Sequence, residues 1–157
     1  MNIKTLTVAA LAISWAFAGQ PGAAEKELGK HQVPKPVLEA FEKAYPNAKG
    51  VEYEQAMFEG QPAYEVEYKE DGKEYELLYG ADGRLLQKEE EIEIKALPEP
   101  VVQAVTKAHP KAKIKEAEKL MKPDGAVIGY EVEVKKDGKE YEITLDVVGK
   151  ILSTEQD

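Results

Sequence analysis

Polar and apolar residues alternate one by one along two short segments of this chain, residues 64–68 and 130–134. In both segments, glutamates stand between aromatic or aliphatic residues. A period of two places the two sets of side chains on opposite faces of a β-strand. The dipeptide Asp-Gly follows each segment, at 71–72 and at 137–138, and is a typical hairpin turn. The pattern therefore predicts two β-hairpins, each with one apolar and one acidic face.

Apolar residues spaced three and four apart predict two helices, each bounded by prolines. Proline is tolerated in the first turn of a helix, and the residue before a proline avoids helical geometry. Pro34 and Pro46 therefore mark the limits of the first helix, and Pro98 and Pro110 those of the second. The apolar stripes consist of Val37, Leu38, Phe41 and Tyr45, and of Val101, Val102, Val105 and His109. Helices of this length are marginal alone, so each is expected to pack on a sheet.

The order of helix and strands occurs twice along the chain. Residues 33–57 match 97–121 at 12 of 25 positions, and residues 64–86 match 130–152 at 13 of 23. We therefore predict an α+β fold built from two tandem repeats, each a helix followed by a four-stranded antiparallel sheet. The predicted boundaries are residues 25–95 for the first repeat and 96–157 for the second.

Residues 1–24 have the pattern of a secretory signal peptide. Lys4 supplies the positive charge, an apolar run covers residues 6–18, and small residues precede two candidate cleavage sites, after Ala18 and after Ala24. The run is shorter than the roughly 20 residues of a membrane-spanning helix. We therefore predict an exported protein, periplasmic or extracellular, with no membrane contact after cleavage. The chain has no cysteine, which excludes a disulfide framework and a lipid anchor on an N-terminal cysteine.

The chain is acidic, with 21 lysines and arginines against 30 aspartates and glutamates and a formal charge of −9. Removal of residues 1–24 takes away only Lys4, which leaves 20 basic and 30 acidic residues and a charge of −10. Nucleic acids and anionic membranes bind basic surfaces, so neither is expected as a partner. A protein partner with a basic surface fits this charge.

Few residues are suited to catalysis or to specific metal binding. The histidines are His31, in a polar segment, and His109, which stands where the other repeat has Tyr45. A position that accepts both tyrosine and histidine favours packing over acid–base chemistry. The Asp-Gly turns lack the spacing of acids in an EF-hand loop, and two histidines without cysteine do not make a structural zinc site. The sequence therefore predicts no catalytic residue, no cofactor and no metal-binding residue.

Several of these segments together resemble PepSY-like domains. They are the helices that end in Tyr-Pro or His-Pro, the Tyr-Glu-Val-Glu strands, the Asp-Gly-Lys turns, and the closing segments Gly-Arg-Leu-Leu and Gly-Lys-Ile-Leu. The resemblance covers about residues 33–155 and extends to the tandem-repeat β-lactamase inhibitor proteins and to the propeptides of thermolysin-type metalloproteases. It implies a secreted, non-enzymatic module that binds another protein, for example as an inhibitor of a hydrolase or a peptidase. It carries no inhibitory residue over to this sequence.

The glutamates of the predicted hairpins form the candidate partner-binding face. They project away from the tyrosines and valines, with Leu78 and Phe58 as exposed apolar anchors beside them. The candidate residues are Glu65, Glu67, Glu74, Glu76, Leu78, Phe58, Glu131, Glu133, Glu140 and Glu142, with Glu52, Glu54, Glu116 and Glu118 as an extension. The charge run at 89–91 predicts a solvated strand. Two alternatives stay open, a solvated face without a partner and a face that binds cations or small ligands.

Overall fold

The computed structural model describes residues 26–156, so the predicted signal peptide at 1–24 and both of its cleavage sites lie outside the described residues. The helices are α1 (Lys35–Ala44), α2 (Glu99–Ala108) and two short 3-10 helices, Lys30–Gln32 and Ile94–Ala96. The strands are β1 (Lys26–Glu27), β2 (Lys49–Phe58), β3 (Gln61–Glu70), β4 (Lys73–Gly80), β5 (Leu85–Glu91), β6 (Lys113–Met121), β7 (Val127–Lys136), β8 (Lys139–Asp146) and β9 (Ile151–Gln156). Within these residues neither α-helix has the length and apolar character needed to cross a membrane.

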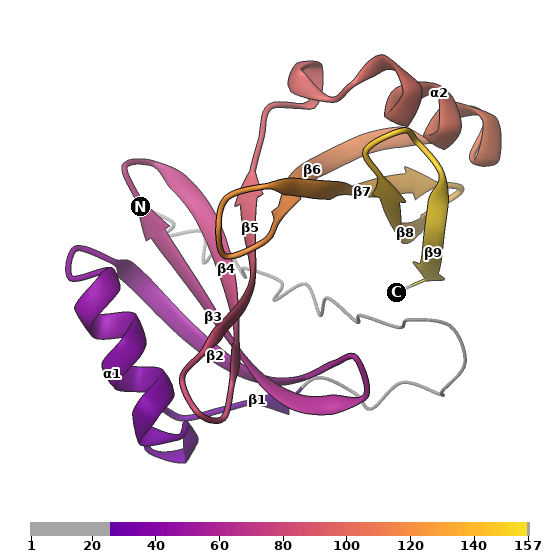
Figure 1. Cartoon of the computed structure of the whole chain (residues 1–157). Helices are drawn as coiled ribbons and strands as arrows, with labels where there is room; N and C mark the ends of the chain where they lie inside the picture. The colour runs from indigo at the N-terminus through magenta and orange to yellow at the C-terminus, as the bar shows by residue number, and fades with distance from the viewer. Residues whose placement is uncertain (1–25, 157) are drawn as a thin grey trace, which may run out of the picture.

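The nine strands form one antiparallel sheet in chain order from β1 to β9 (Figure 1). The predicted α+β class is confirmed, but the prediction of a separate four-stranded sheet in each repeat is wrong. The last strand of the first repeat, β5, pairs with β6 of the second, with Lys88 opposite Met121 and Glu91 opposite Glu118. A free β5 would expose a row of unpaired backbone groups, and this pairing satisfies them. The short strand β1 adds a further pair at the edge of β2.

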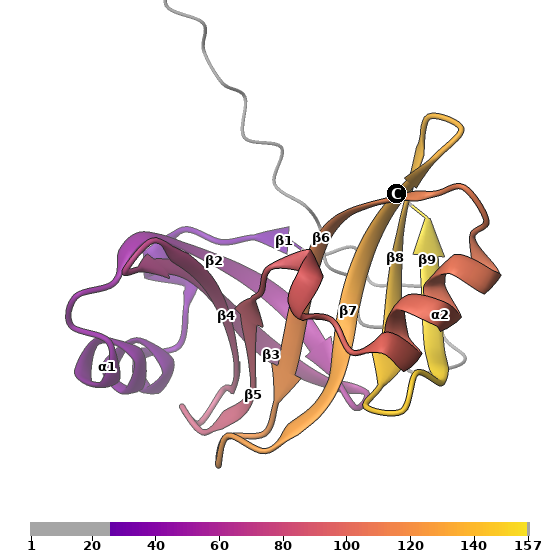
Figure 2. The ribbon, with the colours of Figure 1, turned by 90° about the horizontal axis from the view of Figure 1, so that it is seen from above.

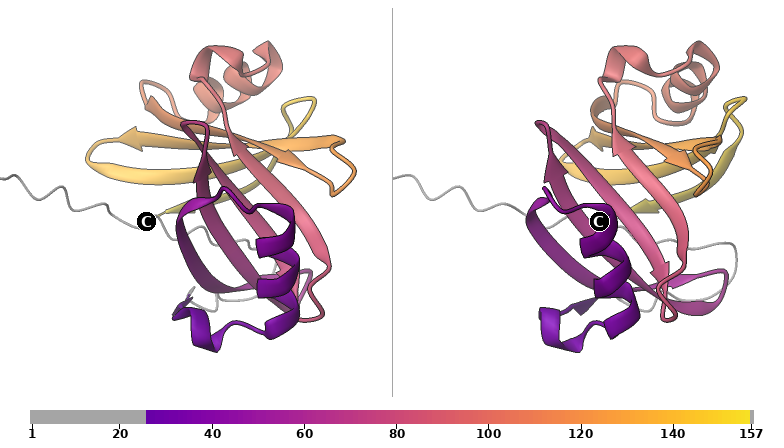
Figure 3. Two further views of the ribbon diagram at one scale, coloured as in Figure 1. Left: turned by 90° about the vertical axis from the view of Figure 1, so that its left-hand side faces the viewer. Right: turned by 60° about the vertical axis from the view of Figure 1, so that its left-hand side comes forward.

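Both α-helices lie on the same side of the sheet, and each covers its own half (Figures 2 and 3). In the first half, Val37 and Phe41 of α1 belong to one buried cluster with Val66 and Leu77 of the sheet. The second cluster places Val101 and Val105 of α2 with Val132, Ile143 and Leu145. The apolar stripes of the helices and the apolar phase of the strands are therefore confirmed, because both sets of side chains meet in the core.

Aromatic rings fill the first core more than the second. Tyr68 contacts Phe41, Tyr45 and Tyr75 at ring-centroid distances of 5.4, 4.9 and 5.2 Å. In the second repeat His109 ends α2, and its ring lies 5.0 Å from that of Tyr141. The packing role predicted for His109 is therefore confirmed.

The predicted hairpin at residues 71–72 is confirmed by its backbone geometry. Asp71 and Gly72 have φ angles of 52° and 80°, and the corresponding pair in the second repeat has 52° and 81°. Positive φ at both central residues defines the type I′ turn, whose twist matches that of the flanking strands. The tight turns keep β3 against β4, so the glutamates of both strands share one face of the sheet.

Glu90 links the two repeats, and its replacement by glutamine is expected to destabilise the protein by about 1 kcal/mol. Its carboxylate pairs with Lys73 of β4 and, at 3.0 Å, with Lys119 of β6, and its side chain is only 16% exposed. The hydrogen bond from Lys73 holds the pKa of Glu90 below its usual range, and Lys119 adds to this effect. Urea unfolding at pH 7 measures the loss.

The control for Glu90→Gln is Glu93→Gln, the same chemical change in the same junction. Glu93 pairs with Lys95 at 2.5 Å, but its side chain is 70% exposed, so its loss is expected to leave the free energy of unfolding unchanged. Equal stability of the Glu90→Gln variant and the unmodified protein would show that the junction depends on backbone pairing alone.

Candidate functional site

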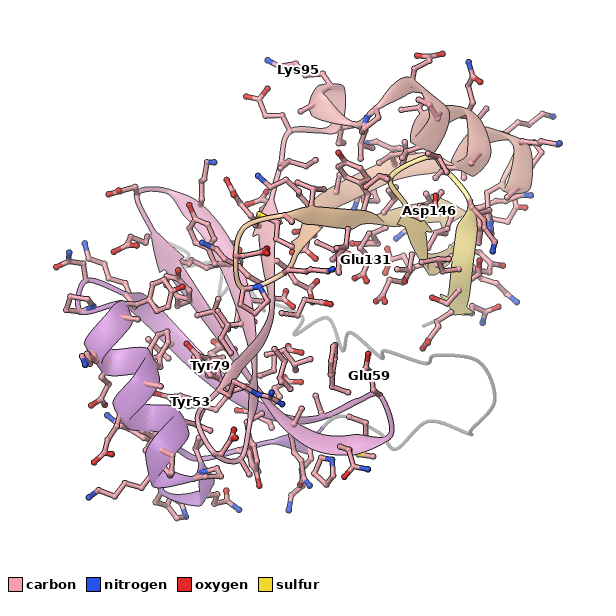
Figure 4. The ribbon with its side chains drawn as sticks, in the orientation of Figure 1. Tyr53, Glu59, Tyr79, Lys95, Glu131 and Asp146 are labelled. Carbon is pink, nitrogen blue, oxygen red and sulfur yellow. The ribbon has the colours of Figure 1, made fainter. Side chains whose placement is uncertain are left out.

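The face of the sheet that carries no helix is the acidic one. The sheet bends around its middle strands, and this face lies on the inner side of the bend (Figures 1 and 3). Figure 4 shows Tyr53 and Tyr79 on the side of α1, whereas Glu131 extends from β7 toward the enclosed side. We call this side the inner face; its glutamates come from the alternate positions of β2 to β9 that do not face the helices.

The candidate glutamates lie on the predicted face of the sheet, opposite the tyrosines and valines, but four of them are buried and not exposed. Glu65, Glu76, Glu131 and Glu142 are each less than a tenth exposed. Glu67, Glu74, Glu133 and Glu140 are half-buried. Curvature toward the inner face crowds the side chains there, and this tertiary effect is absent from the strand pattern. Their part in binding a partner stays a prediction.

The prediction that Leu78 is an exposed anchor is wrong. Leu78 is 3% exposed and packs with Ala56 and Ala63 on the inner face. Phe58 and Leu86 lie half-buried against this small cluster. The inner face therefore has an apolar patch beside its carboxylates, and Phe58 and Leu86 form the accessible part of it.

Glu89 was not among the candidate residues, yet it is at the centre of the inner face. It is 2% exposed, so the prediction of a solvated strand at 89–91 is wrong at this position. It stands directly opposite Glu76 of β4, while Glu118 of β6 stands opposite Glu91, two residues further along the same strand. Residues two apart share a face, so Glu118 is the diagonal neighbour of Glu89.

The side chains of Glu76, Glu89 and Glu118 meet at the inside of the bend. Each contributes a carboxylate oxygen, and these atoms lie within 4.8 Å of one another. Glu131 stands opposite Glu118 on β7 and continues the row. Within residues 26–156, Oε2 of Glu76, Glu89 and Glu131 is buried without a hydrogen-bond partner. The amide of Gln87 donates a hydrogen bond to Oε1 of Glu89 over 3.2 Å.

Burial and mutual repulsion raise the pKa values of these carboxyls. Burial raises the pKa of Glu118 to about 8, with further contributions from Glu116, Glu74 and Glu91. The pKa values of Glu76, Glu89 and Glu131 lie well above the usual range for the same reasons, burial first and neighbouring glutamates second. The cluster therefore favours bound protons or a bound cation over free negative charge.

The hairpin ends of the inner face are partly neutralised. Lys69 pairs with Glu74 at 3.1 Å, and Lys135 pairs with Glu140 at 2.5 Å in the equivalent place of the second repeat. Burial and a hydrogen bond with Glu74 raise the pKa of Glu67 to about 8, and that bond lowers the pKa of Glu74. Negative charge is therefore least compensated away from the hairpin ends.

A hollow lies on the helix side of the sheet, between α1, β1 and β2. It encloses about 680 Å³ and is lined by Phe41, Tyr45 and Tyr53 together with the side chains around them. At its edge Lys30 and Glu42 pair at 2.6 Å. Its rings belong to the first core, and Lys30 and Glu42 at its edge pair with each other, so the chemistry available there is weaker than that of the glutamate cluster.

Two domain families match parts of the chain. The peptidase propeptide and YPEB domain, PepSY, matches residues 36–78, and the β-lactamase-inhibitor-like, PepSY-like domain matches residues 85–153. The two matches cover most of both repeats. A search of curated proteins finds no match.

Solved structures from Bacteroides species share the fold. One, described as a candidate periplasmic protein of Bacteroides eggerthii, has 18% sequence identity and a TM-score of 0.61, over 79% of this chain and 88% of that chain. A BLIP-like protein of Bacteroides fragilis has 24% identity and a TM-score of 0.54, over 78% of this chain and 84% of that chain. At these identities the likeness is evidence for the fold and not for a shared ligand.

Proposed function

The chain belongs to the PepSY-like family, as its sequence predicted, and from this premise we propose that it is an exported, non-enzymatic module that binds another protein through its inner face. The observation that carries the proposal is the separation of the two faces of the sheet. Helices cover one face, and a row of glutamates with an apolar patch occupies the other. The partner that this chemistry fits is a protein segment that presents lysines or arginines around an apolar side chain.

Charge supports a basic partner more than a neutral one. A docking lysine or arginine can reach the half-buried Glu67 and Glu133, and its positive charge favours the ionised form of the carboxyls on this face. A cleft of one charge sign with low-dielectric walls focuses the field and raises the association rate of an opposite charge. Phe58 supplies an apolar contact at the border of the patch.

Inhibition of a hydrolase or a peptidase is the form of binding that we propose. The descriptions of the matching domains name a β-lactamase-inhibitor-like domain and a peptidase propeptide. A curved acidic face is suited to a basic loop near the active site of such an enzyme. Purified β-lactamases and extracytoplasmic metallopeptidases are therefore the first enzymes to assay for loss of activity.

A matched pair of charge variants tests the face. Glu67→Gln/Glu133→Gln removes two carboxyl groups from the inner face, and Glu39→Gln/Glu99→Gln removes two from the exposed surfaces of the helices. Partners captured by the whole chain from extracytoplasmic extract at low salt are purified, and their dissociation constants are measured in EDTA. We expect the inner-face variant to bind at least about tenfold more weakly and the helix variant to bind normally.

Two outcomes would contradict this assignment. Equal weakening by the two variants would mean that only net charge matters, and equal affinity of both variants with the unmodified chain would place the contact elsewhere. Salt provides a further check, because an electrostatic contact weakens as the Debye length falls from about 30 Å at 0.01 M to about 8 Å at 0.15 M.

A further inference from the structure

The meeting of three carboxylates on three adjacent strands is unusual for a sheet. Like charges opposite one another destabilise a strand pair, yet Glu76 stands opposite Glu89, and Glu118 stands opposite both Glu91 and Glu131. The carboxylate oxygens of the first three converge to within 4.8 Å, and these side chains are buried. Buried charge is stable only when it is paired or coordinates a metal, so the cluster requires a neutralising species.

Unpartnered oxygens point to a ligand independently of the number of acids. Oε2 of Glu76 and Oε2 of Glu89 are buried without a hydrogen bond, and so is Oε2 of Glu131, which lies outside the group of three. Buried polar side-chain atoms nearly always have a partner in folded proteins. Glu131 of β7 stands directly opposite Glu118 of β6, so the fourth carboxylate lies on the same face next to this group.

The lysines nearest to β5 in the described part of the chain do not neutralise these glutamates. Lys73 and Lys119, on the two strands that flank β5, both pair with Glu90. Glu90 follows Glu89 in the strand, and its side chain therefore projects from the opposite face. The groups that act most strongly on Glu76 and Glu89 are other glutamates, together with Gln87.

We propose that Glu76, Glu89 and Glu118 bind one calcium ion, with Glu131 as an adjacent ligand. Carboxylate oxygens are hard ligands of the kind that Ca²⁺ and Mg²⁺ prefer. Ca²⁺ takes oxygens at about 2.3–2.6 Å in flexible geometry, so two ligands on opposite sides of the ion stand about 5 Å apart. Mg²⁺ demands near-ideal octahedral geometry at about 2.0–2.1 Å and keeps several of its waters, so a buried group of carboxylates on three strands suits Ca²⁺ better.

The surroundings supply further ligands and a route of entry. Gln87 donates its amide N–H to Glu89, and its carbonyl oxygen is a neutral ligand of the kind that calcium takes. Glu76 and Glu118 are buried, with 8% and 7% of their surface exposed, and the inner face that carries them is the side from which an ion would enter. A site of this kind binds without any partner protein and is independent of the proposed function.

Calcium titration of the whole chain tests the site. After treatment with EDTA and its removal by dialysis, CaCl₂ is added to about 10 mM at pH 8, which exceeds the dissociation constants of about 0.1–1 mM found in extracellular calcium modules. We expect Tm to rise by about 5 °C, because a ligand that binds only the folded state stabilises it. Calorimetry measures the affinity directly, and we expect Mg²⁺ to bind more weakly.

The test variant is Glu89→Gln, and its control is Glu90→Gln, one residue along the same strand and on the opposite face. We expect Glu89→Gln to weaken calcium binding at least about tenfold, as loss of one charged ligand should. The control should be less stable without calcium yet show the full calcium-dependent rise in Tm. Glu76→Gln/Glu89→Gln removes a second ligand and should abolish the heat of binding.

Three results would overturn the proposal. One is an equal rise in Tm for Glu89→Gln and the unmodified chain, and another is the same rise in NaCl of matched ionic strength, because both indicate screening of the net charge. The third is tighter binding of Mg²⁺ than of Ca²⁺. Partner binding is measured in EDTA. A failure of the calcium titration therefore leaves the proposed function intact, and a failure of the partner-binding experiment leaves the calcium site intact.

Discussion

Raising the pH from about 5 to about 9 in EDTA is expected to lower Tm by about 10 °C, through ionisation of the buried glutamates. Burial and neighbouring carboxylates raise the pKa of Glu118 to about 8 and those of Glu76, Glu89 and Glu131 well above the usual range. In the unfolded chain these groups titrate near 4.5. Between these values the folded protein binds protons that the unfolded chain has released.

The direction of the effect follows from this difference in bound protons. Stability changes with pH in proportion to the protons bound by the unfolded chain minus those bound by the folded protein. That difference is negative between about 4.5 and 8, so the free energy of unfolding falls as the pH rises. The contribution of each carboxyl is complete below pH 4.5 and is lost as the pH passes its folded-state value. One pKa unit corresponds to about 1.4 kcal/mol of stability. The neighbouring carboxyls lose their protons one after another and not independently, so together they give about 2–3 kcal/mol.

Other carboxyls act in the opposite direction but weakly. Lysine partners lower the pKa values of Glu90 and Glu140, and the hydrogen bond with Glu67 lowers that of Glu74. These groups add stability above pH 4.5, but they are partly exposed and solvent screens them. The buried cluster should therefore dominate, and thermal unfolding followed by circular dichroism at half-unit pH steps measures the net slope.

Glutamine variants identify the groups responsible for this slope. Glu76→Gln/Glu89→Gln replaces two titrating carboxyls by neutral side chains of the same size, so its Tm should exceed that of the unmodified chain at pH 9 and vary less with pH. Glu90→Gln should keep the full slope, because its carboxyl lies outside the cluster. A Tm that is flat or rises from pH 5 to 9 in the unmodified chain would mean that the cluster ionises at ordinary values.

Local signals predicted most of the fold. The helix limits lie within two residues of the bounding prolines, and the Asp-Gly turns and strand phases agree with the structure because each depends on contacts between near neighbours in the chain. The pairing of β5 with β6 was not predictable in this way. The helix α2 separates these strands in sequence, and no turn residue marks their register.

The missed features of the candidate site have the same origin. The burial of Glu89 depends on β6, which the strand pattern alone does not bring beside it. Leu78 was predicted to be exposed because it shares a face with glutamates, yet the curvature of that face covers it with Ala56 and Ala63. A recognisable signal was present, since Gln87, Glu89 and Glu91 alternate in phase with the glutamates of β4.

Protons, calcium and a basic partner would compete for the same negative charge. A cation bound by Glu76, Glu89 and Glu118 removes repulsion within the cluster and should reverse the loss of stability at high pH. It also adds positive charge beneath Glu67 and Glu133, which opposes the docking of the proposed basic partner. The calcium site and the docking face are therefore separate in their tests but coupled through electrostatics across the inner face.

Gly83→Ala is expected to destabilise the protein by about 3 kcal/mol or more, whereas Gly72→Ala should cost about 1 kcal/mol. Both glycines have φ near 80°, where a side chain is strained. Only at Gly83 does an added Cβ meet backbone, since it would lie 2.4 Å from the carbonyl oxygen of Pro36. At Gly72 no atom lies within 4 Å of the added Cβ, so the difference between the variants isolates the contact between the β4–β5 turn and α1.

The second repeat provides an independent copy of this experiment. A Cβ at Gly149 would lie 2.5 Å from the carbonyl oxygen of Pro100 in α2, whereas Gly138 has no atom within 4 Å. Urea unfolding of all four alanine variants should therefore give two large and two small losses in the free energy of unfolding. If Gly83→Ala cost no more than Gly72→Ala, and Gly149→Ala no more than Gly138→Ala, the strained φ alone would explain the losses. Unequal losses would show that close contact with a turn holds each helix on the outer side of the sheet and leaves the glutamate face uncovered.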